Sequence, residues 1–125
     1  MSIVRLAALA SLIIPAAAAA QSMNAETFHR KATALKAKGP LALFSGDLKL
    51  LTNEAKGAGQ RNRELRLAAG KAGHKPRYCP PEGPQAMGNS EFMARLGAIP
   101  AADRARIDMT EAMARVLAAK FPCPR

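Results

Sequence analysis

Large aromatic side chains are scarce: tryptophan is absent, tyrosine occurs once and phenylalanine four times in 125 residues. Proteins that bind single-stranded nucleic acid stack bases on aromatic rings, so this scarcity argues against that class. It also limits the core, because alanine, leucine and methionine bury less area than aromatic rings do. A domain of about 100 residues with such a core is marginally stable from burial alone. We therefore expect a further constraint on the fold.

Metal ligands and catalytic motifs are also few. The chain has two cysteines and two histidines, and neither pair has the close spacing of a zinc site, which needs about four ligands. Ser45-Gly46 lacks the flanking pattern of a nucleophile elbow. Gly57-Ala58-Gly59 lacks the lysine and hydroxyl residue of a phosphate-binding loop. The sequence therefore predicts that the protein is not an enzyme and holds no metal or other cofactor.

The N-terminus has the pattern of a secretory signal peptide. Arg5 is the only charge before an apolar run at 6–14, and Pro15 leads into alanines at 16–20. A basic start, a short apolar run and a small-residue cleavage site are typical of exported proteins. The run is too short for a membrane anchor, which needs about 20 residues. We expect a signal peptide at 1–20, a mature domain at 21–125, no transmembrane segment, and a periplasmic or secreted location.

Basic residues outnumber acidic residues by 19 to 9. In a cytoplasmic chain this balance suggests nucleic acid, but export argues against that partner. An acidic protein, such as a cell-wall hydrolase or toxin, or an anionic envelope polymer fits better. The predicted binding surface comprises Arg61, Arg63, Arg66, Lys71, Lys75, Arg77 and Tyr78. A solvated helix face explains the same charges equally simply, and the sequence leaves open whether the protein is a monomer or a homodimer.

Apolar residues recur at three- and four-residue steps, which predicts helices, and no segment alternates as a strand does. Asn24 is the expected cap of a first helix that ends at Gly39. Pro40 opens a second helix with an apolar seam of Leu41, Phe44, Leu48, Leu51 and Ala55, widened by Leu43 and Leu50. We expect this helix to end or hinge at 56–59.

A basic helix follows at 60–72, with Leu65 facing inward. A short helix then carries Phe92 and Leu96, and a last helix is capped by Asp108. The expected fold is all-α: a single small domain of four or five short helices stapled by one disulfide.

Cys79 and Cys123 are the candidate disulfide. Residues 74–89 contain four prolines and two glycines, which predicts a long loop, and a disulfide at Cys79 gives a reason for its length. An even cysteine count in an exported chain favours an internal bridge over two free thiols or an intermolecular bridge. Closing a loop of about 44 residues is worth about 4 kcal/mol in the chain-entropy model.

The C-terminal half carries a family resemblance over about residues 78–124. The segments concerned are Cys79-Pro80-Pro81, Ser90-Glu91-Phe92-Met93, Ile99-Pro100 and Phe121-Pro122-Cys123-Pro124. Together they resemble the Rap/Tai-type immunity proteins. The resemblance implies a small exported helical protein that neutralises a peptidoglycan amidase toxin delivered by rival cells. The first half lacks the extra cysteines and the aromatic-glycine segment common in that family, and no toxin-contact residue carries over.

Two functional hypotheses follow. The first is an exported helical binding protein that acts as an immunity-type inhibitor by docking on a cell-wall amidase. The second is a basic envelope protein, structural or stress-related, that associates with an anionic envelope polymer.

Overall fold

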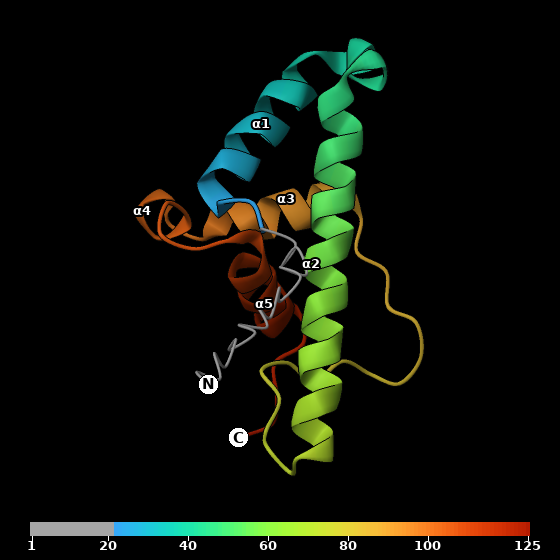
Figure 1. Ribbon diagram of the computed structural model, residues 1–125, viewed down its shortest axis with the longest axis vertical. Helices are drawn as coiled ribbons and strands as arrows, with labels where there is room; N and C mark the ends of the chain where they lie inside the picture. Colours follow the sequence, from blue (N-terminus) through green and yellow to red (C-terminus); the bar gives the residue numbers. More distant parts are fainter. Residues whose placement is uncertain (1–21) are drawn as a thin grey trace, which may run out of the picture.

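A computed structural model of the protein describes residues 22–125, so the predicted signal peptide lies outside the described residues. This part of the chain forms α1 (Ala25–Ala37), the 3₁₀ helix η1 (Gly39–Phe44), α2 (Gly46–Lys71), α3 (Asn89–Ala98), α4 (Ala101–Arg104) and α5 (Met109–Lys120). The predicted all-α class is confirmed. Helix α2 is the long rod of the molecule; α1 and η1 meet it at one end, and the loop after α2 lies at the other (Figure 1).

Local signals set the ends of α1 and α5 as expected. Asn24 Oδ1 accepts hydrogen bonds from the backbone N–H groups of Glu26 and Thr27, at 3.0 and 3.1 Å. Asp108 Oδ1 accepts one from the N–H of Glu111 at 2.9 Å. These caps satisfy N–H groups that have no partner within the helix. Gly39 follows α1 with a φ of +58°, a conformation that favours glycine, and turns the chain into η1.

Helix α2 is continuous, so the predicted end or hinge at 56–59 was wrong. The helix has 26 residues and runs through Gly57 and Gly59. Ala58 between them is fully buried, and the side-chain amide of Asn62 donates to its carbonyl at 2.8 Å and to the Thr110 carbonyl of α5 at 2.9 Å. Packing against α1 and α5 therefore offsets the weak helix propensity of the two glycines.

The predicted inward direction of several leucines was also wrong. Leu41, Leu43 and Phe44 are 70, 74 and 89% exposed, because η1 lies at the end of the molecule where no other described element covers it. Leu65 is 62% exposed. The stripe of α2 that turns inward is instead formed by Leu51, Ala55, Ala58, Asn62, Arg66 and Ala69. It contains two polar residues, which an apolar pattern does not identify.

The core lies around α5. Met109, Ala112, Met113 and Val116 of α5 are buried, and α5 packs against α1, α2 and α3. Phe28 of α1 meets Phe92 of α3 edge to face, with ring centroids 5.9 Å apart. Such aromatic pairs contribute about 1 kcal/mol beyond their area burial. The largest fully buried side chains are only Leu96, Met109 and Val116, as the composition predicts for a small core.

A buried arginine joins three elements. Arg104 of α4 is 6% exposed, and its Nε donates to a carboxylate oxygen of Glu26 on α1 at 2.7 Å. The same guanidinium donates to the carbonyls of Gly97 and Ile99 at the end of α3. These bonds satisfy a charge that would be costly to bury without partners.

The predicted disulfide is present. Cys79 and Cys123 are bonded, with Cα atoms 4.8 Å apart across 44 positions. Beside the bond, the N–H of Cys79 donates to the Phe121 carbonyl at 2.8 Å, and Tyr78 is 6% exposed. The loop between α2 and α3 has no helix or strand, as its prolines predict. Within residues 22–125 no helix has the length and apolar character needed to cross a membrane.

Replacing Gly59 by alanine tests the continuity of α2. A Cβ at Gly59 would meet no atom within 4 Å, so Gly59→Ala should raise the free energy of unfolding by about 0.5–1 kcal/mol in urea denaturation. Gly39→Ala is the matched contrast and should destabilise, because φ there is +58°. A loss of stability in Gly59→Ala would contradict a regular helix at this point.

Removing the disulfide tests how much the fold depends on it. Cys123→Ser should destabilise the oxidised protein by about 4 kcal/mol in the chain-entropy model, which lowers Tm by more than about 10 °C. Cys79 should then react with a maleimide. The idea fails if both cysteines of the non-reduced wild type already react, or if Tm is unchanged.

Candidate functional site

Two surfaces compete as the functional site: the predicted basic surface beside the disulfide, and an apolar groove near the other end of α2. Among the residues predicted for the basic surface, the structure gives internal partners to Arg61, Arg66, Lys75 and Arg77, whereas Arg63 and Lys71 are exposed with no ion pair among residues 22–125. Tyr78 is buried. Most of these side chains therefore brace the fold.

Arg61 ties α2 to α5 and to the first described residue. Its Nε donates to Thr110 Oγ1 at 2.7 Å, and its Nη2 lies 3.3 Å from Ser22 Oγ. Ser22 Oγ also accepts from the N–H of Thr110 at 3.0 Å. A hydrogen-bonded guanidinium in this position is less available to an outside partner, so Arg61 acts chiefly as a structural residue.

Arg66 contacts the ring of Tyr78, and the neighbouring Arg77 pairs with α5. The Arg66 guanidinium carbon lies 5.4 Å from the centre of the Tyr78 ring, within the range of a cation–π interaction. Arg77 donates to both carboxylate oxygens of Glu111 on α5, at 2.5 and 3.0 Å. A small cleft of about 120 Å³ lies among these residues and Lys75. Its size suits a few water molecules or a small ligand rather than a macromolecule.

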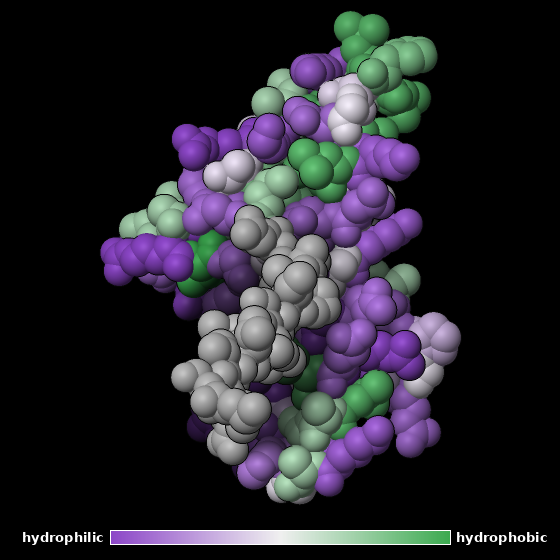
Figure 2. Space-filling view, in the orientation of Figure 1, coloured by the Kyte–Doolittle hydropathy of each residue, from purple (hydrophilic) through white to green (hydrophobic). Residues whose placement is uncertain are grey.

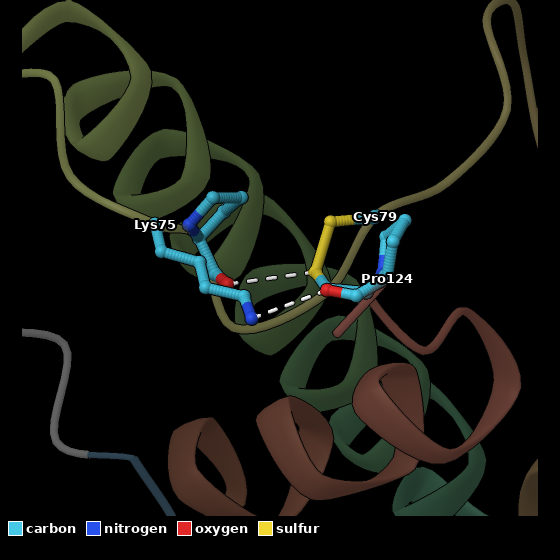
Figure 3. Close-up of a disulfide and its surroundings, with 5 residues drawn as sticks. Lys75, Cys79 and Pro124 are labelled. Atoms are coloured by element: carbon cyan, nitrogen blue, oxygen red, sulfur yellow. Dashed lines mark hydrogen bonds between the residues drawn. A yellow bond between two sulfur atoms is a disulfide. The ribbon is translucent and has the colours of Figure 1, made fainter.

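The end of the chain is fastened at the same place (Figure 3). Lys75 Nζ donates to the Pro124 carbonyl at 3.3 Å. Cys123 Sγ lies 3.5 Å from the Pro76 carbonyl oxygen, a contact rather than a hydrogen bond because a disulfide sulfur carries no proton. The loop, the C-terminal residues and α2 therefore form one structural joint.

Three carboxylates are held by cations in the same way. The hydrogen bond from Arg77 lowers the pKa of Glu111, and the hydrogen bond from Arg104 lowers the pKa of Glu26. The hydrogen bond from Lys120 of α5 lowers the pKa of Glu91 on α3. In each case the charged form of the carboxyl is favoured. These ion pairs join separate parts of the fold, and the lowered pKa values of the three carboxyl groups reflect contacts that stabilise it.

The apolar groove lies between α1, α2 and α3 and has a volume of about 740 Å³. Its lining residues are Phe28, His29, Ala32, Thr33, Leu35, Lys36, Gly39, Ala42, Leu48, Leu51, Thr52, Ala55, Asn89, Ser90, Phe92, Met93 and Ala94. Most are apolar or small, with polar groups at intervals. The sequence pattern missed the groove because its residues are distributed over 28–94 and only the fold brings them together.

Beside the groove is the apolar tip, which we define as Leu41, Leu43 and Phe44 of η1. All three are exposed, and none of them lines the groove. Figure 2 shows hydrophobic side chains gathered at this end of the molecule. The tip and the groove lie at the same end of the molecule, since Gly39 and Ala42 of η1 line the groove.

No cluster of metal ligands is assembled in the part of the chain that the structure describes. No three His, Cys, Asp or Glu side chains there are grouped as metal ligands. His29 lies on the groove wall next to Gly97 of α3, with Nε2 3.5 Å from where a Cβ of that glycine would be. The arrangement supports binding by shape and polarity.

Comparisons with protein-family models, with curated proteins and with solved structures gave no match. The resemblance to Rap/Tai-type immunity proteins is therefore still a prediction from the C-terminal motif alone.

The paired carboxylates predict a dependence of stability on pH. Because their pKa values are lower in the folded protein, the stabilisation is complete above the unfolded value of about 4.3 and is lost as pH falls through the folded value. Glu111→Gln should be less stable than wild type at pH 7 and should lose less stability between pH 7 and about pH 3, measured by urea midpoints. Glu82→Gln, in the exposed loop, should follow wild type. An unchanged pH dependence in Glu111→Gln would refute the role of the Arg77 pair.

Proposed function

We propose that the protein is an exported helical binding protein that docks on another protein of the cell envelope through the groove between α1, α2 and α3. The resemblance to immunity proteins adds a specific partner, a cell-wall amidase that the docked protein would inhibit. The observation that carries the proposal is the groove itself. The core is small, yet the chain leaves Leu48, Phe92 and Met93 partly exposed at the wall of this groove.

The walls of the groove suit a protein segment. They are formed by three helices held together by the core and by the Phe28–Phe92 contact, so the surface is preformed. An amphipathic helix or loop can bury its apolar side in such a groove, as in helix-in-groove recognition. Thr52 and Ser90 at the wall offer hydroxyl groups for hydrogen bonds to the partner, whereas the Thr33 hydroxyl already donates to the His29 carbonyl at 2.8 Å. Met93 adds an adaptable apolar contact.

Charge favours an acidic partner. Six of the nine acidic residues form ion pairs within residues 22–125: Glu26, Asp47, Glu54, Glu91, Asp103 and Glu111. The excess positive charge is thus left on exposed lysines and arginines, among them Lys36 at the groove. A field of one sign accelerates association with a partner of the opposite sign.

The covalent structure fits an exported protein. The Cys79–Cys123 bond is stable where thiols are oxidised, as in the periplasm or outside the cell. The disulfide and the absence of a membrane-spanning helix from residues 22–125 are compatible with the location that the signal peptide pattern predicts. Inhibition in this setting needs no catalysis: a rigid, stapled body blocks a hydrolase by covering its substrate cleft.

The proposal is tested with a double variant in the groove. Thr52 and Ala94 are exposed residues of the groove wall, so Thr52→Glu with Ala94→Glu should preserve the fold while adding bulk and negative charge. When the wild type is incubated with periplasmic extract and cross-linked, it should capture an amidase. It should also slow the hydrolysis of purified peptidoglycan by that amidase. The groove variant should lose affinity by at least about tenfold.

A matched control separates the groove from general charge. Asn53→Glu with Ala68→Glu makes the same charge change at exposed positions of α2 outside the groove, and it should inhibit as wild type does. Capture of no amidase would contradict the inhibitory role. Recovery of only lipopolysaccharide or murein, released from all three proteins by modest salt, would support the envelope-polymer alternative instead.

A further inference from the structure

The apolar tip has no structural explanation within the fold. Leu41, Leu43 and Phe44 are 70, 74 and 89% exposed at the far end of the molecule from the disulfide (Figure 1). A contiguous group of exposed large apolar side chains is a feature of interaction surfaces, whereas singly scattered ones are normal. The core, the groove and the disulfide joint all exclude these three residues.

The tip is held in place. The N–H of Ser45 donates to the Ala42 carbonyl at 3.0 Å, and the N–H of Leu48 donates to the Ser45 carbonyl at 3.2 Å. Ala42 is the residue of η1 that turns inward and packs against the core. With Ala42 fixed inside, the neighbouring side chains of Leu41 and Leu43 are presented outward. The exposed side chains are thus a feature of a short ordered helix.

Three lysines lie in the segments that flank η1 on either side. We define the lysine collar as Lys36 in the last turn of α1, Lys38 at its C-terminal cap, and Lys49 in the first turn of α2. All three are exposed, and none forms an ion pair with another residue of the described chain. The one acidic residue in the first turn of α2, Asp47, lies 4.0 Å from Lys31 and is paired with it.

We propose that the apolar tip and the lysine collar bind the protein to an anionic lipid surface. Apolar side chains that enter the boundary between headgroups and acyl chains, with lysines at headgroup level, are the arrangement by which peripheral proteins lie on membranes. Lysine stems extend along apolar surface while their charges stay in water. Three side chains are too few for the core of a stable protein interface, which needs about 800 Å² on each partner. A lipid surface accepts a tip of this size.

The inference is independent of the proposed function. The groove serves a protein partner, and the tip would place the molecule end-on at a membrane. Because no tip residue lines the groove, the tip can be altered without changing the groove, and the failure of one proposal does not decide the other.

Vesicle flotation tests the proposal. The oxidised mature protein is mixed with vesicles of phosphatidylcholine, with or without about 30% phosphatidylglycerol, at about 50 and 500 mM salt. We expect binding to the anionic vesicles at low salt and little binding to the neutral vesicles. Leu43→Ser with Phe44→Ser should weaken the binding by at least about tenfold, and Lys36→Gln with Lys38→Gln should remove most of its dependence on phosphatidylglycerol.

Two controls are available within the chain. Leu65→Ser with Leu67→Ser removes two leucines that are 62 and 47% exposed far from η1, and Arg63→Gln with Lys71→Gln removes two exposed cations. Both should bind vesicles as wild type does. The proposal is overturned if wild type does not float with anionic vesicles, if the tip variant floats equally well, or if the controls lose as much binding. It is also overturned if the tip variant changes the oligomeric state without vesicles, because the tip would then cover a second copy.

Discussion

The fold depends on the burial of one face of α5, which is fixed at both ends. At its start the N–H of Met109 donates to the Met23 carbonyl at 2.7 Å, and the N–H of Ala25 donates to the Ile107 carbonyl at 2.9 Å. At its end the disulfide joins Cys123 to the loop after α2. Few large side chains are fully buried, so these fastenings keep α5 seated where burial alone would be marginal.

The two ends of the molecule differ in how fully their side chains are engaged within the fold. Around the disulfide, cations such as Arg61, Arg66 and Arg77 are engaged in hydrogen bonds, ring contacts and ion pairs that hold α2, the loop and α5 together. At the opposite end the groove between α1, α2 and α3 is open and the large side chains of η1 are exposed. A chain with more aromatic residues could have filled that space. Here the unfilled space is the part of the surface best suited to a partner.

The sequence predicted the features that short stretches of residues determine, and it missed those that depend on packing between helices distant in sequence. Caps at Asn24 and Asp108, the proline-rich loop and the disulfide all follow from local chemistry or compartment. Continuity of α2 through Gly59 depends on its contact with α5. The positions of neighbouring elements also decide which side chains are covered: Asn62 and Arg104 are buried, whereas Leu41 and Phe44 are exposed. A pattern that equates apolar with buried cannot find a groove whose walls come from three helices.

The groove and the lysine collar near η1 share one residue. Lys36 lines the groove and also belongs to the lysine collar. If an acidic partner occupies the groove, its carboxylates and the lipid phosphates draw on the same ammonium group, so each weakens the electrostatic part of the other's binding. The apolar parts do not conflict, because tip and groove have no residue in common. Lipid charge would then shift the affinity of the groove without changing its shape.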